Sequence, residues 1–112
     1  INESRKRWKI RFDTPEKWRE SVRGYYRLIT GVDDAIGQLM TKLEEIGEAD
    51  NTVIILMGDH GFYLGEHGLA GTWYPHQESL KIPLAIYDPR LDKEKRGKRD
   101  DRYAFNIVCV TR

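Results

Sequence analysis

The stretch TVIILMGDHG, residues 52–61, decides the fold class of this chain. Its first six residues are β-branched or apolar on both faces, a pattern typical of a strand covered on both sides in a parallel sheet. Gly58 ends the strand, and Asp59 and His60 follow at once. Ligands of open α/β sheets bind beyond the carboxyl ends of the strands. The stretch therefore predicts a buried strand and a candidate site at its end.

A long amphipathic helix is predicted before this strand. Apolar residues recur at steps of three and four between residues 22 and 46, which is the spacing of one helix face. Thr14 is suited to cap the helix, Pro15 to its first position, and Gly47 to its end. We expect one helix over residues 14–47, after an irregular, basic lead-in at residues 1–13.

The remaining sequence predicts shorter elements. Residues 75–80 favour one or two helical turns and residues 83–87 a second strand, so residues 52–90 hold a strand, a candidate metal loop and a second strand. Residues 91–112 form a charged segment and a terminal element, with a third strand or a helix at 103–110. The predicted class is α/β: one long amphipathic helix and about three strands from a mostly parallel sheet flanked by helices. Because sheets usually have five or six strands, we expect a fragment of a larger domain.

Composition excludes several classes of protein. Aromatic residues make up 11% of the 112 residues and the net charge is +1, which is unlike a disordered chain. The longest apolar run, residues 53–57, is far shorter than the ~20 residues of a membrane span. A single cysteine, Cys109, excludes a disulfide scaffold. Both ends of the chain are basic but carry no nucleic-acid motif, so we expect solvated surface and no nucleic-acid partner.

Asp59 and His60 are the candidate metal ligands. A carboxylate and an imidazole lie side by side between Gly58 and Gly61, which let the backbone approach a ligand closely. The alternative is structural: Asp59 caps the loop and His60 packs. The pair alone leaves both interpretations open.

Several motifs in a fixed order extend beyond this pair. They are YY at 25–26, VDD at 32–34, IG at 36–37, DNT at 50–52, GDHG at 58–61, LGEHG at 64–68 and ESLKIPL at 78–84. Together they resemble the formylglycine-dependent sulfatases of the alkaline phosphatase superfamily. The resemblance covers the region between residues 25 and 90.

The resemblance implies a chemistry. Sulfatases hydrolyse sulfate esters or sulfamates with the hydrate of a formylglycine, while a divalent metal neutralises the sulfate oxygens. Two metal ligands come from an early aspartate pair, and the other two positions match Asp59 and His60. Calcium is the metal implied first, with Mn²⁺ and Zn²⁺ as alternatives because a histidine is among the ligands.

Weaker candidates for substrate contact follow the metal loop. Thr72 stands where the family commonly places a lysine, so the positive charge of that contact is missing. His67, His76 and Trp73 are further candidates; the alternatives are that His67 and Glu66 order the loop and that the aromatic rings pack. The aspartates at 33–34 are expected on the helix surface, away from any metal.

The family's nucleophile motif, Cys/Ser-x-Pro-x-Arg, is absent. Cys109 precedes Val110-Thr111-Arg112 and follows the metal pair, so we expect a buried structural cysteine. The formylglycine and the early aspartate pair are expected outside this chain. We therefore interpret the chain as a middle-to-late segment of a sulfatase catalytic domain without its N-terminal half, inactive in isolation.

Two other functions stay open: a phosphodiesterase or phosphonate monoester hydrolase of the same superfamily, and a non-catalytic metal or interaction module. The expected partner of the complete enzyme is a sulfated small molecule or glycan, and exposed sheet edges offer a route to oligomers. Residues 1–11 show no signal peptide. The resemblance implies a periplasmic, extracellular or lysosomal location, and these two observations together leave the location of the protein unknown.

Overall fold

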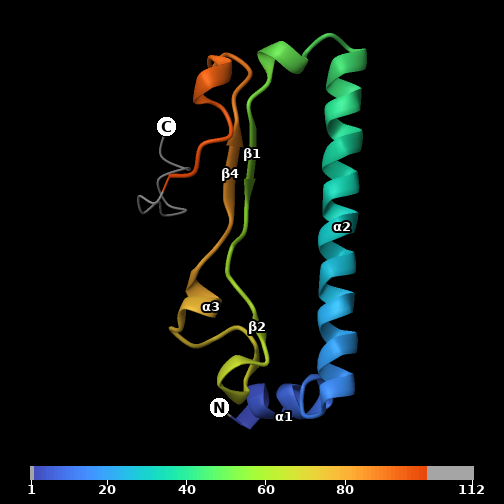
Figure 1. Ribbon diagram of the computed structural model, residues 1–112, viewed down its shortest axis with the longest axis vertical. Helices are drawn as coiled ribbons and strands as arrows, with labels where there is room; N and C mark the ends of the chain where they lie inside the picture. The colour runs from blue at the N-terminus through green and yellow to red at the C-terminus, as the bar shows by residue number, and fades with distance from the viewer. Residues whose placement is uncertain (1, 101–112) are drawn as a thin grey trace.

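The computed structural model describes residues 2–100. One long helix, α2, dominates it, with two short antiparallel strand pairs beside it (Figure 1). The helices and strands are α1 (Asn2–Arg11), α2 (Pro15–Glu45), β1 (Ile54–Met57), β2 (Tyr63–Leu64), β3 (Ala70–Gly71), α3 (Gln77–Leu80) and β4 (Leu84–Tyr87), and 3-10 turns lie at Ala49–Asn51, Glu66–Gly68 and Lys93–Lys95.

The long helix confirms its sequence signals. The Thr14 hydroxyl accepts a hydrogen bond from the Lys17 N–H at 3.3 Å, and Pro15 is the first helical residue. The helix ends at Glu45, and Gly47 follows with a φ of 74°, the left-handed conformation that favours glycine. Local capping chemistry therefore sets both ends.

The prediction of an irregular lead-in is wrong, because Asn2–Arg11 is helical. Glu3 forms ion pairs one turn along the helix with Lys6 at 4.0 Å and Arg7 at 3.6 Å. Ser4 is buried, and the helix packs against β3. Contacts with a distant part of the chain, together with these pairs, support a helix that has no regular apolar face.

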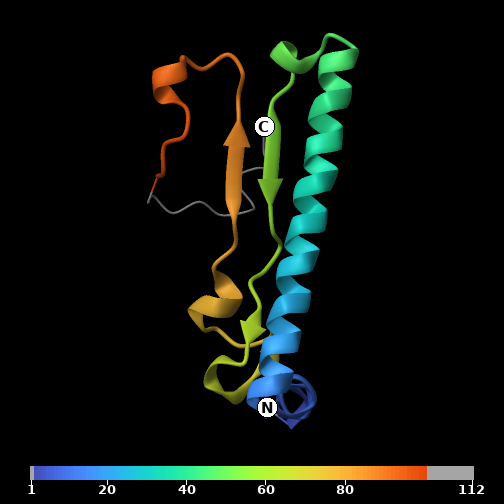
Figure 2. The same ribbon diagram turned by 45° about the vertical axis from the view of Figure 1, so that its right-hand side comes forward.

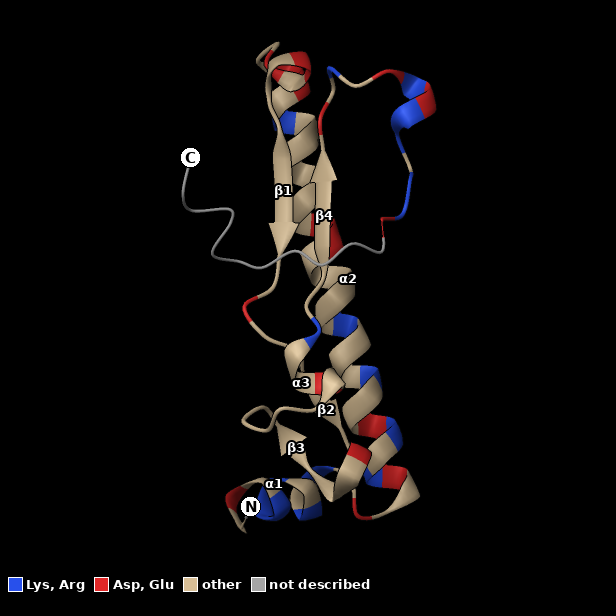
Figure 3. Cartoon of the chain, turned by 90° about the vertical axis from the view of Figure 1, so that its left-hand side faces the viewer, with Lys and Arg blue, Asp and Glu red and all other residues tan. Residues whose placement is uncertain are grey.

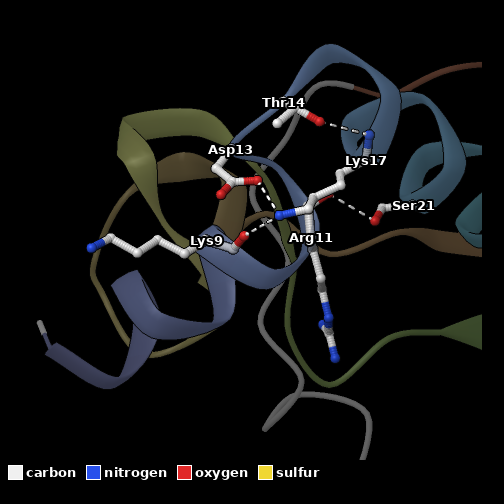
Figure 4. A network of polar contacts seen from close by, with 6 residues as sticks. All are labelled: Lys9, Arg11, Asp13, Thr14, Lys17 and Ser21. Carbon is white, nitrogen blue, oxygen red and sulfur yellow. Dashed lines mark hydrogen bonds and ion pairs between the residues drawn. The ribbon is translucent and has the colours of Figure 1, made fainter.

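A compact polar network fixes the corner between α1 and α2 (Figure 4). The Lys17 ammonium donates to the Asp13 carboxylate at 2.7 Å and to the Lys9 carbonyl at 3.2 Å. The Ser21 hydroxyl donates to the Arg11 carbonyl at 3.0 Å. These hydrogen bonds hold the last turn of α1 against the N-terminal end of α2.

The predicted strands pair with each other. β1 and β4 run antiparallel, with Ile54 opposite Tyr87 and Met57 opposite Leu84 (Figure 2). β2 and β3 form a second antiparallel pair within the glycine-rich segment, residues 58–74, which has glycines at 58, 61, 65, 68 and 71. The parallel neighbours expected of β1 are not among residues 2–100.

The buried apolar residues lie where α1, the N-terminal end of α2 and the β2–β3 pair meet. Phe12, Tyr63, Leu69 and Ala70 form the buried apolar core of the described residues. β1 was predicted to be buried on both faces, but Ile55 in this strand is 52% exposed. A two-stranded sheet lacks the neighbours that would cover it. Figure 3 shows no charged residue on β1 or β4. This composition is typical of strands that are buried in a protein core.

Two sequence predictions lie outside the described residues: the terminal element at 103–110 and the environment of Cys109. Within the described part, no helix combines the length and the apolar character needed to cross a membrane.

Candidate metal and substrate site

The loop that carries Asp59 and His60 is held on both sides by backbone hydrogen bonds. The Gly58 N–H donates to the Pro83 carbonyl at 3.2 Å, next to β4. The Gly61 N–H donates to the Ser79 carbonyl at 2.7 Å, in α3. A Cβ at Gly61 would lie 2.8 Å from the Lys81 carbonyl oxygen and closer still to that of Glu78. Glycine is therefore required where the loop meets α3.

Asp59 and His60 present two donor atoms side by side. One Asp59 carboxylate oxygen, Oδ1, accepts from the His60 N–H at 3.0 Å, and the other, Oδ2, lies 3.6 Å from His60 Nε2. His60 Nδ1 lies 2.9 Å from the Gly61 carbonyl. A proton on Nδ1 that donates to this carbonyl leaves the Nε2 lone pair available. The side chains of Asp59 and His60 are 89% and 54% exposed, so solvent and ligands can reach both of them.

This donor set fits a divalent metal. Metal–ligand distances are about 2.0–2.6 Å for carboxylate oxygen and imidazole nitrogen, so donor atoms 3.6 Å apart can bind one ion. A mixed nitrogen and oxygen pair suits Mn²⁺ or Zn²⁺, and the carboxylate also suits Ca²⁺. Residues 2–100 hold no group of three or more His, Cys, Asp or Glu side chains placed to share a metal. The pair would thus supply part of a coordination shell.

A shallow depression of about 380 Å³ joins the pair to two of the predicted substrate residues. Its lining comprises Asp59, His60, Thr72, Trp73, Tyr74, Pro75, Ser79 and Leu80. Thr72 contributes a hydroxyl and no charge. Trp73 is 76% exposed and has a φ of 105°, a backbone conformation that costs a non-glycine residue about 1–3 kcal/mol.

His67 and His76, also predicted as substrate contacts, are not in the lining of this depression. Their rings stack on each other with centroids 4.3 Å apart and an interplanar angle of 22°. His67 Nε2 lies 3.3 Å from Glu78 Oε2. A hydrogen bond from its own backbone N–H and the contact with His67 lower the pKa of Glu78. The two histidines therefore contact each other and, through His67, Glu78, and they do not line the depression that holds Asp59 and His60.

Tyr63 is the central residue that sequence reasoning missed. Its side chain is fully buried, and this burial raises the pKa of the phenol. The hydroxyl donates to the Tyr74 carbonyl at 3.1 Å and lies 2.7 Å from His76 Nδ1, which must then donate to it because the phenol has one proton. The apolar run at 62–64 between two glycines was the available signal for a buried residue in this loop.

Two further contacts order the segment around Tyr63. The Glu66 carboxylate accepts from the Leu64 N–H at 2.6 Å, in agreement with the loop-ordering interpretation of this residue. The Trp18 indole N–H donates to the Leu64 carbonyl at 3.0 Å and joins β2 to α2. Asp33 and Asp34 are exposed on α2, as predicted.

Comparison with known proteins identifies relatives over most of this region. A sequence profile of the sulfatase family matches residues 2–107. An N-acetylglucosamine-6-O-sulfatase of Bacteroides thetaiotaomicron is 40% identical over 91 residues, which are 81% of this chain and 16% of that protein. The multifunctional alkaline phosphatase superfamily protein PehA of Trinickia caryophylli is 45% identical over 83 residues, 74% of this chain and 16% of that protein.

A solved structure is also similar to this chain in both sequence and fold. It is described as a complex with its substrate, D-glucosamine-2-N,6-O-disulfate, and it is 41% identical to this chain with a TM-score of 0.60, over 65% of this chain and 15% of that one. The chain thus spans about a sixth of the length of the relatives it matches. The predicted α/β class and the resemblance are both confirmed, and the chain belongs to the sulfatase family.

Proposed function

We propose that this chain forms part of the active site of a sulfatase that hydrolyses sulfate esters of sugars. The observation that carries the proposal is the exposed Asp59–His60 pair after the end of β1, in which Asp59 Oδ2 and His60 Nε2 lie 3.6 Å apart. Membership of the sulfatase family supports the reaction type. The sulfated glucosamine in the related structure supports a sugar as the alcohol part of the ester.

Asp59 and His60 would hold a divalent metal through one carboxylate oxygen and Nε2. The metal, when bound, neutralises negative charge on the sulfate oxygens. A proton on His60 Nδ1 that donates to the Gly61 carbonyl would leave Nε2 as the metal-binding nitrogen and would hold the ring in this orientation. The hydroxyl of Thr72 is placed in the same depression and can donate one hydrogen bond to a sulfate oxygen.

Residues other than 2–100 would supply the remaining chemistry. The attacking formylglycine and the aspartate pair that completes the metal shell are those implied by the family resemblance. With two metal ligands and no nucleophile, residues 2–100 alone should not turn over a sulfate ester.

A second candidate reaction is hydrolysis of phosphodiesters or phosphonate monoesters. Two observations favour keeping it. Thr72 supplies no positive charge where sulfatases commonly have a lysine, and the 45% identical relative PehA is described as multifunctional within the alkaline phosphatase superfamily.

The test uses the natural protein at its full length and esters of one leaving group. Wild-type protein is assayed with 4-nitrophenyl sulfate, bis(4-nitrophenyl) phosphate and 4-nitrophenyl phenylphosphonate. We expect sulfate to be the preferred substrate, and Asp59→Asn and His60→Ala each to lower kcat/KM by about a hundredfold or more. A matched control is Asp34→Asn, an exposed carboxylate on α2 that should leave kcat/KM unchanged.

Two results would contradict the proposal. Preference for either phosphorus ester would favour the second candidate. Full activity in Asp59→Asn and His60→Ala would remove the metal role of the pair whichever ester is preferred.

A further inference from the structure

Trp73 combines features that call for an explanation. The residue is 76% exposed, the largest exposed fraction among the large apolar residues that are exposed in the described part of the chain. Its backbone φ of 105° is strained for any residue but glycine. It also lines the same depression as Asp59 and His60. An exposed aromatic ring held in a strained conformation beside candidate ligands indicates a binding role.

Tyr63 holds the chain on both sides of Trp73. On the N-terminal side, the backbone of Tyr63 pairs with Gly71 in the β2–β3 ladder. On the C-terminal side, the Tyr63 hydroxyl donates to the Tyr74 carbonyl at 3.1 Å and contacts His76 at 2.7 Å. Tyr63 is fully buried, so one buried residue holds both ends of the short segment that carries the exposed indole: its backbone holds the N-terminal end and its hydroxyl the C-terminal end.

The surroundings of the indole specify the kind of ring it would bind. One large apolar surface is open, while the polar groups of Asp59, His60 and Thr72 lie in the same depression. A pyranose has a C–H face that can stack on an indole, and its ring substituents project outward to polar groups and solvent. An aromatic leaving group has no such substituents to satisfy these polar neighbours.

We propose that Trp73 is the stacking surface for the pyranose ring of the substrate and that Tyr63 is the residue that positions it. This inference rests on the proposed function, because it takes Asp59 and His60 to mark the end of the depression where the sulfate binds. It adds a specificity-determining residue: Trp73 selects for the sugar, while Asp59 and His60 serve any sulfate ester.

The test compares a substrate that has a ring with one that has none. The natural full-length protein is assayed with D-glucose 6-sulfate and with 2-hydroxyethyl sulfate. In Trp73→Ala we expect KM for glucose 6-sulfate to rise about three- to tenfold with kcat within twofold of wild type, since aromatic stacking has this magnitude. KM for 2-hydroxyethyl sulfate should stay within twofold. Trp73→Phe should restore most of the loss.

The positioning role of Tyr63 has its own readout. Tyr63→Phe keeps the buried ring and removes the contacts with Tyr74 and His76. KM for glucose 6-sulfate should rise in this variant, and the additional effect of Trp73→Ala should become smaller, because the two residues act through one contact. Tyr26→Ala, an exposed aromatic residue on α2, is the matched control and should change neither substrate's KM.

An unchanged KM for glucose 6-sulfate in Trp73→Ala would overturn the inference, and so would equal losses for both substrates. Failure of the proposed function looks different: wild type would hydrolyse neither sulfate ester. In that case the stacking surface is tested by the indole N–H resonance of Trp73. A shift with glucose 6-sulfate but not with 2-hydroxyethyl sulfate supports the inference, and no shift with either overturns it.

Discussion

Gly61→Ala tests the close contact between the candidate metal loop and α3. The added Cβ would lie 2.8 Å from the Lys81 carbonyl oxygen and nearer to that of Glu78, both backbone atoms that cannot rotate away. Relieving this overlap should cost about 1–3 kcal/mol, as overpacking of a close contact does. The 2.7 Å hydrogen bond from Gly61 to Ser79 would also be strained or lost, at about 1 kcal/mol. The free energy of unfolding should therefore fall by about 2–4 kcal/mol.

Urea unfolding followed by circular dichroism measures this change, with the midpoint and slope fitted for each variant. Gly37→Ala is the matched control, because its Cβ would meet nothing within 4 Å and alanine favours a helix by up to about 1 kcal/mol. The two variants should change stability in opposite directions. A Gly61→Ala protein within about 0.5 kcal/mol of wild type would refute the described contact between the loop and α3, since surface substitutions have effects of that size.

Three further predictions concern stability. Tyr63→Phe should lower the free energy of unfolding by about 1–3 kcal/mol in the same urea assay, because the hydrogen bonds of the buried Tyr63 hydroxyl with the Tyr74 carbonyl and His76 are lost; an unchanged midpoint would count against it. Hydrogen bonds from the Arg90 side chain and backbone lower the pKa of Asp88 from its ordinary 3.8 to about 2, so the ionised carboxylate stabilises the fold above pH 4 and this contribution is lost as pH falls toward 2. Asp88→Asn should flatten the acid dependence of stability over that range, and an unaltered pH profile would contradict the assignment. Thr14→Ala should cost about 1 kcal/mol through loss of the helix cap, measured by thermal unfolding, whereas Thr14→Ser should not.

Local signals predicted the elements whose ends are set by neighbouring residues. Thr14 and Pro15 start α2 as expected, and residues 83–87 contain β4. The helix α1 was not predictable in this way, because it depends on packing against β3, which is some sixty residues later in the sequence. The exposure of β1 was also not predictable, because it depends on which strands lie beside β1. The sequence of one strand does not specify its neighbours.

The candidate site was likewise predictable only where it depends on residues that are close in the sequence. The adjacent residues Asp59 and His60 were predicted as metal ligands from the motif and from their place after a strand, and that role stays a prediction. The depression that joins them to Thr72 and Trp73 depends on turns in the glycine-rich segment, and those turns depend on buried Tyr63. His67 and His76 carry chemistry suited to substrate contact, yet they stack on each other, which their spacing of nine residues did not indicate.

The most direct test of the account is an anomalous diffraction map of the natural full-length protein crystallised with Mn²⁺. We predict one metal peak within about 2.0–2.6 Å of an Asp59 carboxylate oxygen and of His60 Nε2, with His60 Nδ1 still facing the Gly61 carbonyl. A fully occupied metal that neither residue ligates would contradict the central claim that this pair forms part of the metal centre.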